Sequence, residues 1–272
     1  MSLIRNQLIL LTAIVAIVVF LFVKGYKTSE ATIAEGSGTA FAQAFDVQTY
    51  KEGKVKSQSE PMQQRLAELE KAGKSITGLQ NLIVLWDSLN NQFLSAYYMG
   101  QYAEMEPTEK NWFAAGSKYY TFASLSNDSF MMSEAAKKAK GAFEKVLSIN
   151  PNNLDAQTAV AVIYVQIDQD VMKGVGLLKD VVAKDSNNIQ AIFTLGMLSI
   201  QSGQFDKAQE RFEKLITIQP FNPEYYFYLG EVYAKGGNTP KAIKTYETCK
   251  TLLKDEAAKK EIESLINKLK NI

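Results

Sequence analysis

The segment that decides the fold is written twice. "LGMLSIQSGQFDKAQERF", residues 195–212, is followed 34 residues later by "LGEVYAKGGNTPKAIKTY", residues 229–246. Leu-Gly, a turn glycine, Lys-Ala and an aromatic residue recur in the same slots. A fixed period of this length is the signature of a repeat architecture, in which each unit buries its apolar face against its neighbours. The shared letters therefore predict helix–helix packing, and the letters that differ carry the information about function.

Two weaker copies precede this pair. Their marker residues are Trp112, Ala115, Gly116, Tyr119, Ala139, Phe143 and Pro151 in one copy, and Val160, Ala161, Tyr164, Gly174, Leu178 and Val181 in the other. The pattern resembles the tetratricopeptide repeat family, whose repeat is W-x-x-L-G-x-x-Y, then A-x-x-x-F, then P. The resemblance covers about residues 109–253 in four copies. It implies an all-α stack of helical hairpins.

The chain around the repeats is predicted to be helical as well. We expect a helical hairpin extension at 60–106, a repeat array at 107–253 and a C-terminal capping helix at 254–272. Apolar residues at three- and four-residue steps predict one long helix over 79–103, and Thr108 is a suitable N-cap for the next. The first copy carries an insertion of about 11 residues, which predicts longer helices that turn near Asn127-Asp128. Gly203 and Gly237 are expected to adopt positive φ in turns.

The N-terminus predicts a membrane anchor. Residues 8–23 form an apolar run interrupted only by Thr12, with Arg5 before it and Lys24 after it, and about 20 such residues span a bilayer. The alternative is a cleaved signal peptide, whose apolar core is usually about 7–15 residues. We predict an anchor at 1–25, then a linker at 26–59 in which Phe41, Phe45, Val47 and Tyr50 either dock or stay free. This predicts a single-pass protein whose repeats lie across the membrane, and the resemblance to membrane-anchored bacterial tetratricopeptide proteins implies the inner membrane and the periplasm.

Composition argues against catalysis and against nucleic acid as a partner. The chain has no histidine and a single cysteine, Cys249, which removes His-based acid–base chemistry and most zinc sites. Its formal net charge is only +1, so nothing attracts a polyanion to the whole molecule. We therefore predict no catalytic residues, no metal, no cofactor and no nucleic-acid partner.

The resemblance also implies a binding site. In tetratricopeptide proteins, first-helix positions outside the repeat signature line a concave groove. Here these positions are Phe113, Ser117, Tyr120, Thr158, Val162, Gln166, Phe193, Met197, Ile200, Phe227 and Glu231. None is Lys, Asn or Arg, so the family's carboxylate clamp for chaperone tails is not expected. The apolar trough suits a helix or an extended peptide. Alternatively, the 79–103 helix or the C-terminal helix of the chain fills it.

Two functions follow from these expectations. The first is a membrane-tethered interaction scaffold that holds or assembles an envelope, membrane or secreted protein through the groove, with residues 8–23 in the lipid bilayer. The second is a constitutive, non-catalytic structural subunit of a large multisubunit membrane complex. The analogy with membrane-anchored bacterial tetratricopeptide proteins is one of architecture alone.

Overall fold

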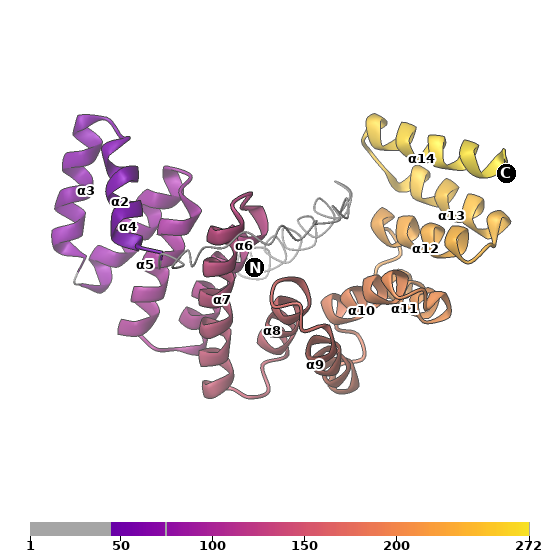
Figure 1. The fold of residues 1–272 in the computed structure, drawn as a ribbon, viewed down its shortest axis with the longest axis horizontal. Coiled ribbons are helices and arrows are strands. Elements are labelled where there is room, and N and C mark those ends of the chain that lie inside the picture. Colours follow the sequence, from indigo (N-terminus) through magenta and orange to yellow (C-terminus); the bar gives the residue numbers. More distant parts are fainter. Residues whose placement is uncertain (1–44, 74, 272) are drawn as a thin grey trace, which may run out of the picture. The chain divides into compact units, whose positions relative to one another are not determined.

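The computed structural model describes residues 45–73 and 75–271, and every regular element in those residues is an α-helix (Figure 1). The helices begin where a side chain caps the free amides of the first turn. Thr108 Oγ1 accepts a hydrogen bond from the Asn111 amide at 3.2 Å, which confirms the predicted cap. Asn222 and Asn238 cap two later helices in the same way. The chain divides into two compact units, and the boundary between Ala159 and Val160 lies inside a helix, α8.

Unit 1 contains six helices and the start of a seventh in its described part. Consecutive members from α3 to α7 pack against one another. Their bounds are α2 Val47–Lys56, α3 Glu60–Ala72, α4 Ile76–Ser88, α5 Gln92–Met105, α6 Glu109–Leu125, α7 Ser129–Ile149 and α8 Leu154–Gln166. The pair α6 and α7 is the first repeat copy. Its helices have 17 and 21 residues and turn at 126–128, which confirms the prediction drawn from the insertion.

Unit 2 holds the end of α8 and six further helices. Each helix from α9 onward packs against the next one in the chain. Their bounds are α9 Val171–Lys184, α10 Ile189–Gln201, α11 Phe205–Ile218, α12 Pro223–Lys235, α13 Thr239–Leu252 and α14 Glu256–Lys270. The predicted turn glycines are confirmed, because φ is +69° at Gly203 and +80° at Gly237.

One contact explains why the same glycine and aromatic positions recur from one repeat copy to another. A Cβ atom added at Gly196 would lie 3.1 Å from the ring of Phe212, and one added at Gly230 would lie 2.7 Å from the ring of Tyr246. The first copy repeats the arrangement, with Gly116 facing Phe143. The missing side chain thus lets an aromatic ring of the second helix lie directly on the first helix. These glycine–aromatic contacts confirm the all-α repeat fold.

Two parts of the structure differ from the sequence-based expectation. The predicted long helix over 79–103 is wrong: it is broken between α4 and α5, where Asn90 has φ of +54° and Asn91 caps the new helix. A left-handed residue cannot continue an α-helix. Within the predicted linker at 26–59, residues 47–56 form α2, which Asp46 caps with hydrogen bonds from two amides.

The membrane prediction requires a correction. The predicted span at 8–23 lies outside the described residues. Among residues 45–73 and 75–271, no helix combines the length and the apolar character needed to cross a bilayer. The longest of the described helices, α7, carries lysine and glutamate side chains along its length, and charges are costly in hydrocarbon. We therefore do not retain the placement as a single-pass inner-membrane protein with periplasmic repeats, nor the transmembrane helix in the predicted fold class.

Candidate functional site

The predicted groove residues of unit 1 lie mostly inside the fold. Ser117 and Tyr120 on α6 are buried, as is Thr158 on α8, whose hydroxyl donates to the Leu154 carbonyl at 2.7 Å. Phe113 is half-buried and its ring lies edge-on to Phe143, with ring centroids 5.4 Å apart. Phe113 is therefore the member of this group whose side chain reaches the surface most.

Unit 2 separates its predicted groove residues into two groups. Those that are buried are Val162 on α8 and Phe193, Met197 and Ile200 on α10. Phe227 and Glu231 on α12 are half-buried, and Gln166 at the end of α8 is exposed. The surface of α12 thus offers more accessible side chains than the surface of α10.

Aromatic rings join α10 to α12. The ring of Tyr228 lies edge-on to Phe193 at a centroid distance of 5.5 Å, and it stacks on Phe212 of α11 at the same distance. Edge-to-face and offset stacked pairs at this spacing add about 0.5–1.5 kcal/mol beyond the area that they bury. The contact fixes the first helices of two successive repeats against each other, so side chains on this face keep defined positions.

The helices α10 and α12 also carry polar groups that the sequence-based list of groove residues did not include. Gln190 Oε1 on α10, and Glu224 Oε1 and the Tyr228 hydroxyl on α12, are buried and have no hydrogen-bond partner among the described residues. Burial raises the pKa of Glu224 from 4.5 to about 8. Burial, and then the nearby Glu224 charge, raise the pKa of Tyr228 above its ordinary value. A signal was present in the sequence: Gln190 and Glu224 occupy the same slot of two copies, 34 residues apart.

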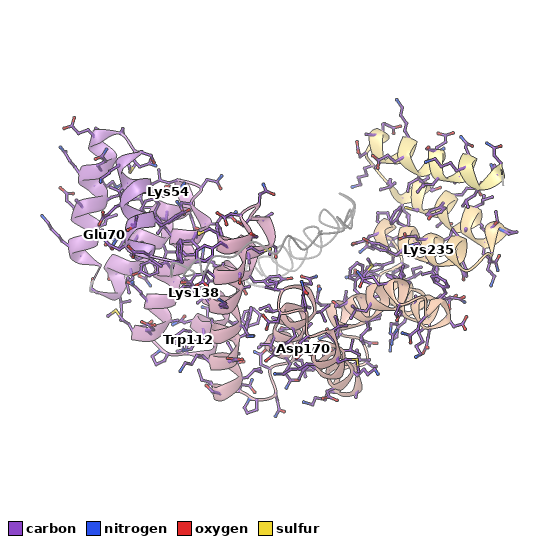
Figure 2. The ribbon with its side chains drawn as sticks, in the orientation of Figure 1. Lys54, Glu70, Trp112, Lys138, Asp170 and Lys235 are labelled. Carbon is purple, nitrogen blue, oxygen red and sulfur yellow. The ribbon has the colours of Figure 1, made fainter. Side chains whose placement is uncertain are left out.

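Glu231 adds a further carboxylate near Tyr228. It pairs with Lys235 on the next turn, and the two charged groups are 2.9 Å apart (Lys235 is labelled in Figure 2). Its charge also helps to raise the pKa values of Tyr228 and Tyr246. The face of α12 therefore carries both carboxylate and aromatic side chains.

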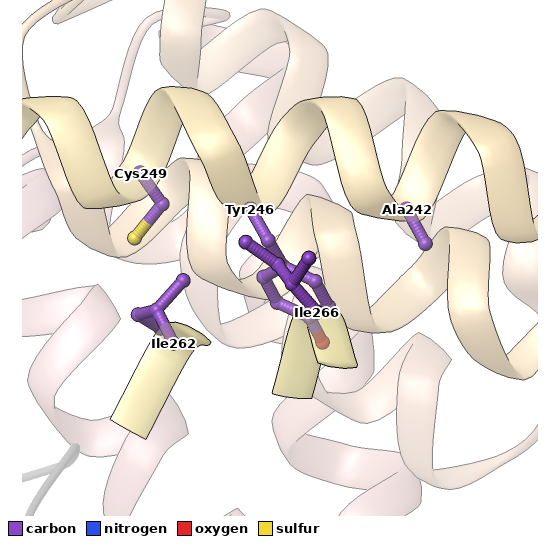
Figure 3. Close-up of a cluster of buried hydrophobic side chains, with 5 residues drawn as sticks. All are labelled: Ala242, Tyr246, Cys249, Ile262 and Ile266. Carbon is purple, nitrogen blue, oxygen red and sulfur yellow. The ribbon is translucent and has the colours of Figure 1, made fainter. Parts of the chain in front are cut away.

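The C-terminal helix covers part of this region. Ile262 and Ile266 of α14 pack against Tyr246 and Cys249 of α13, in the cluster that Figure 3 shows. The half-buried Phe227 packs against the same cluster. The chain thus partly covers Phe227 with its own last helices.

Unit 1 has a second aromatic assembly, which we call the aromatic clasp: Phe45, Tyr50, Phe93, Phe122 and Phe130. The Phe93 ring of α5 is its centre, with centroid distances of 5.1 Å to Phe45, 5.3 Å to Tyr50 and 5.2 Å to Phe122. Phe45 also lies 6.2 Å from Phe130 at the start of α7. Phe45 and Tyr50 of the predicted linker therefore dock, and the lengthened α6–α7 pair supplies part of their binding surface.

Polar contacts hold α2 in the same place. Lys51 Nζ on α2 lies 3.2 Å from Glu70 Oε2 on α3, and the Tyr98 hydroxyl of α5 donates to the other oxygen of Glu70 (Glu70 is labelled in Figure 2). Burial and this carboxylate raise the pKa of Tyr98 far above its ordinary value. The phenol is therefore a permanent donor that ties α5 to α3.

Two further features of the described residues are weak as sites. The cleft between α13 and α14 is lined by charges of both signs, and Lys250 already pairs with Glu263 at 3.2 Å. Within the part of the chain that the structure describes, no three acidic or cysteine side chains gather closely enough to hold a metal ion.

Comparison with known proteins decides the family. A tetratricopeptide repeat model matches residues 174–229, and a second model of the same description matches residues 224–255. This segment belongs to the tetratricopeptide repeat family. The matched residues run from Gly174 of α9 to just beyond α13, so they contain the two copies that agree best with the repeat pattern.

Solved structures with a similar fold have low sequence identity to this chain. "Crystal structure of MamA protein" is 17% identical, covers 68% of this chain and 96% of its own, and has a TM-score of 0.52. "MamA 41-end from Desulfovibrio magneticus RS-1" is 19% identical, covers 65% of this chain and 94% of its own, and has a TM-score of 0.51. At such identities the likeness is one of fold. No curated protein sequence matched the chain.

The tetratricopeptide pattern also explains the less regular second copy. In that copy the first helix has Ala161 where the last two copies have glycine. The close approach moves to the partner helix, where a Cβ atom added at Gly174 of α9 would lie 2.7 Å from the Ala161 carbonyl oxygen. The glycine at the close approach therefore lies on the second helix of this copy.

Proposed function

We propose that this protein is a non-catalytic scaffold that binds a segment of a partner protein on the first helices of its tetratricopeptide pairs. The observation that carries the proposal is the run of matched repeats over residues 174–255. Stacked repeats of this kind form extended surfaces, which such proteins use for binding. The acidic and aromatic face of α12 suits a peptide better than it suits a small molecule.

The predicted groove residues divide between two roles under this proposal. We assign partner contact to those that reach the surface: Phe113 in unit 1, and Gln166, Phe227 and Glu231 in unit 2. The buried members would hold the first helices in position. These are Ser117, Tyr120 and Thr158 in unit 1, and Val162, Phe193, Met197 and Ile200 in unit 2.

Site-specific photocrosslinking in cells tests the proposal. A photoreactive phenylalanine analogue replaces Phe227, and a matched control carries it at the exposed Glu247 of α13, a second helix. We expect a discrete crosslinked product with another protein from position 227 and a much weaker one from position 247. Products that join only parts of this chain, or equal products from both positions, would show that the first-helix face is not the binding surface.

A permanent subunit role is the second candidate, and one observation favours it. Met172 of α9 and Phe221 before α12 are 83% and 81% exposed. Large apolar side chains at such exposure suit a stable interface. Purification from native cells separates the two roles: a fixed stoichiometry that survives washing indicates a subunit, whereas exchange of a labelled partner indicates a scaffold that releases its cargo.

A further inference from the structure

Three buried polar atoms of unit 2 lack hydrogen-bond partners within the described residues: Gln190 Oε1, Glu224 Oε1 and the Tyr228 hydroxyl. We call these three residues the acceptor cluster. Leaving one buried polar atom unsatisfied costs about 1–3 kcal/mol, and more when it is charged. Native proteins keep few such atoms, and those that remain need an explanation.

The acceptor cluster lies on one face of two adjoining first helices. Glu224 and Tyr228 are four residues apart on α12, so their side chains lie one above the other. Gln190 occupies on α10 the slot that Glu224 occupies on α12. The two helices meet where Phe193 lies edge-on to Tyr228, at a centroid distance of 5.5 Å.

The orientation of Gln190 follows from its neighbour. The Thr194 hydroxyl donates its proton to the Gln190 main-chain carbonyl at 2.8 Å. The Thr194 hydroxyl oxygen can therefore only accept from the side-chain amide of Gln190, which lies 3.5 Å away. That amide nitrogen must therefore face Thr194, and the unpartnered atom is the carbonyl oxygen. The amide oxygen of Gln190 and one carboxylate oxygen of Glu224 thus both lack a hydrogen-bond donor.

The helix N-terminus of α12 does not compensate Glu224 for the hydration that its side chain loses on burial. Asn222 caps this end by accepting from the Glu224 amide at 3.0 Å, and a helix N-terminus favours a carboxylate by about 0.3–1 kcal/mol. That attraction lowers the pKa of a carboxyl group, whereas burial raises the pKa of Glu224. The loss of hydration is therefore the larger effect, and the carboxylate lacks a counter-charge.

The chemistry of the cluster selects a cation. A guanidinium or ammonium group offers only donors, which match two oxygen acceptors and a hydroxyl group. Glu231 on the next turn already pairs with Lys235, so the cation would be matched by the carboxyl group of Glu224. An acidic or purely apolar side chain would leave Glu224 unpaired.

We propose that Gln190, Glu224 and Tyr228 form the pocket for an arginine or lysine side chain of the partner segment, with apolar residues of that segment resting on the half-buried ring of Phe227. The inference rests on the proposed function, because it takes the occupant to be a peptide bound on the first-helix face. It adds the chemical class of the side chain that decides specificity.

Peptide selection on the full chain tests the pocket. A library of random 12-residue peptides is selected for binding, and the affinity of the recovered peptides is measured by fluorescence anisotropy. We expect arginine or lysine at one common position. Replacing that arginine by the neutral isostere citrulline, or that lysine by norleucine, should weaken binding about tenfold or more, since charged hydrogen bonds are roughly twice as strong as neutral ones. The two peptide series show which cation the pocket prefers.

Protein variants complete the test. Glu224→Gln keeps the side-chain shape and removes the charge, and we expect the same tenfold loss, whereas Glu247→Gln on the exposed surface of α13 should bind as the wild type does. Circular dichroism confirms that each variant is folded. Selected peptides without a common cation, or equal binding to the Glu224→Gln variant, would overturn the pocket and leave the scaffold proposal standing. A selection that yields no binder would count against both.

Discussion

The Glu224→Gln substitution makes a quantitative prediction about stability. The carboxyl has a pKa of about 8 in the folded protein against an ordinary value of 4.5, so the difference is about 3.5 units. At 1.36 kcal/mol per pKa unit, ionisation above pH 8 costs the folded state at most about 5 kcal/mol. Because the side chain as a whole is only half-buried, solvent screens part of this cost, and we expect the variant to recover about 2 kcal/mol of it.

The sign and the pH window follow from linkage. A carboxyl whose folded pKa is raised stabilises the fold fully below its unfolded pKa, and that stability is lost as the pH rises through the folded pKa. Wild type and variant should therefore unfold alike near pH 4.5, and the variant should gain progressively up to about pH 8. A gain of about 2 kcal/mol corresponds to roughly 8 °C in Tm for a unit of this size.

Far-UV circular dichroism of the full chain, melted in buffers from about pH 4.5 to 8.5, measures this gain. Tryptophan fluorescence is unsuitable, because Trp86 and Trp112 both lie in unit 1. The Glu247→Gln control should show no such pH-dependent gain. If Glu224→Gln melts with the wild type at pH 8, or gains equally at every pH, the carboxyl is not a buried, unpaired acid and the reasoning fails.

Three further outcomes are expected. Gly230→Ala should lower the free energy of unfolding by about 1–3 kcal/mol in urea titrations, because its Cβ would lie 2.7 Å from the Tyr246 ring; unchanged stability would mean that the ring yields freely. Tyr50→Ala removes a ring 5.3 Å from Phe93 and should speed hydrogen exchange throughout α2 by about tenfold, while exchange in unit 2 stays as in the wild type. Burial raises the pKa of Cys249 to about 11, so at pH 8 its thiol should react with a disulfide reagent only at the rate at which the fold opens, and prompt labelling of the native protein would contradict this.

The repeat architecture was predictable because its determinants are local and periodic. The slot glycines and their aromatic partners are separated by a nearly fixed spacing, so Gly196 with Phe212 and Gly230 with Tyr246 could be recognised by alignment alone. Turn glycines and caps act within a few residues, which is why Gly203, Gly237 and Thr108 behave as expected. The break at Asn90 was missed because the apolar stripe continues across it.

The sites were harder to predict because they depend on distance in space. Phe45 docks on rings of α5 and α7, which no periodicity in its own segment reveals. The acceptor cluster requires knowing that one oxygen of Glu224 is buried and unpartnered, whereas its sequence context is that of an ordinary acidic residue in the first turn of a helix. Position in the repeat indicates a face of the helix, but it does not show which residues on that face are covered.

The aromatic clasp changes how unit 1 should bear mechanical load. In a stack whose helices contact only their neighbours, a pulling force can peel away one helical pair at a time. Phe45 lies against Phe93 of α5 and against Phe130 of α7, so it bridges helices that are not consecutive. Tension applied through residue 45 would have to separate those rings before α3 or α4 could detach. Phe45, which directly precedes the N-cap of α2, thus holds several helices of the stack together, and unit 1 should rupture in one step at a higher force than a plain array of the same length.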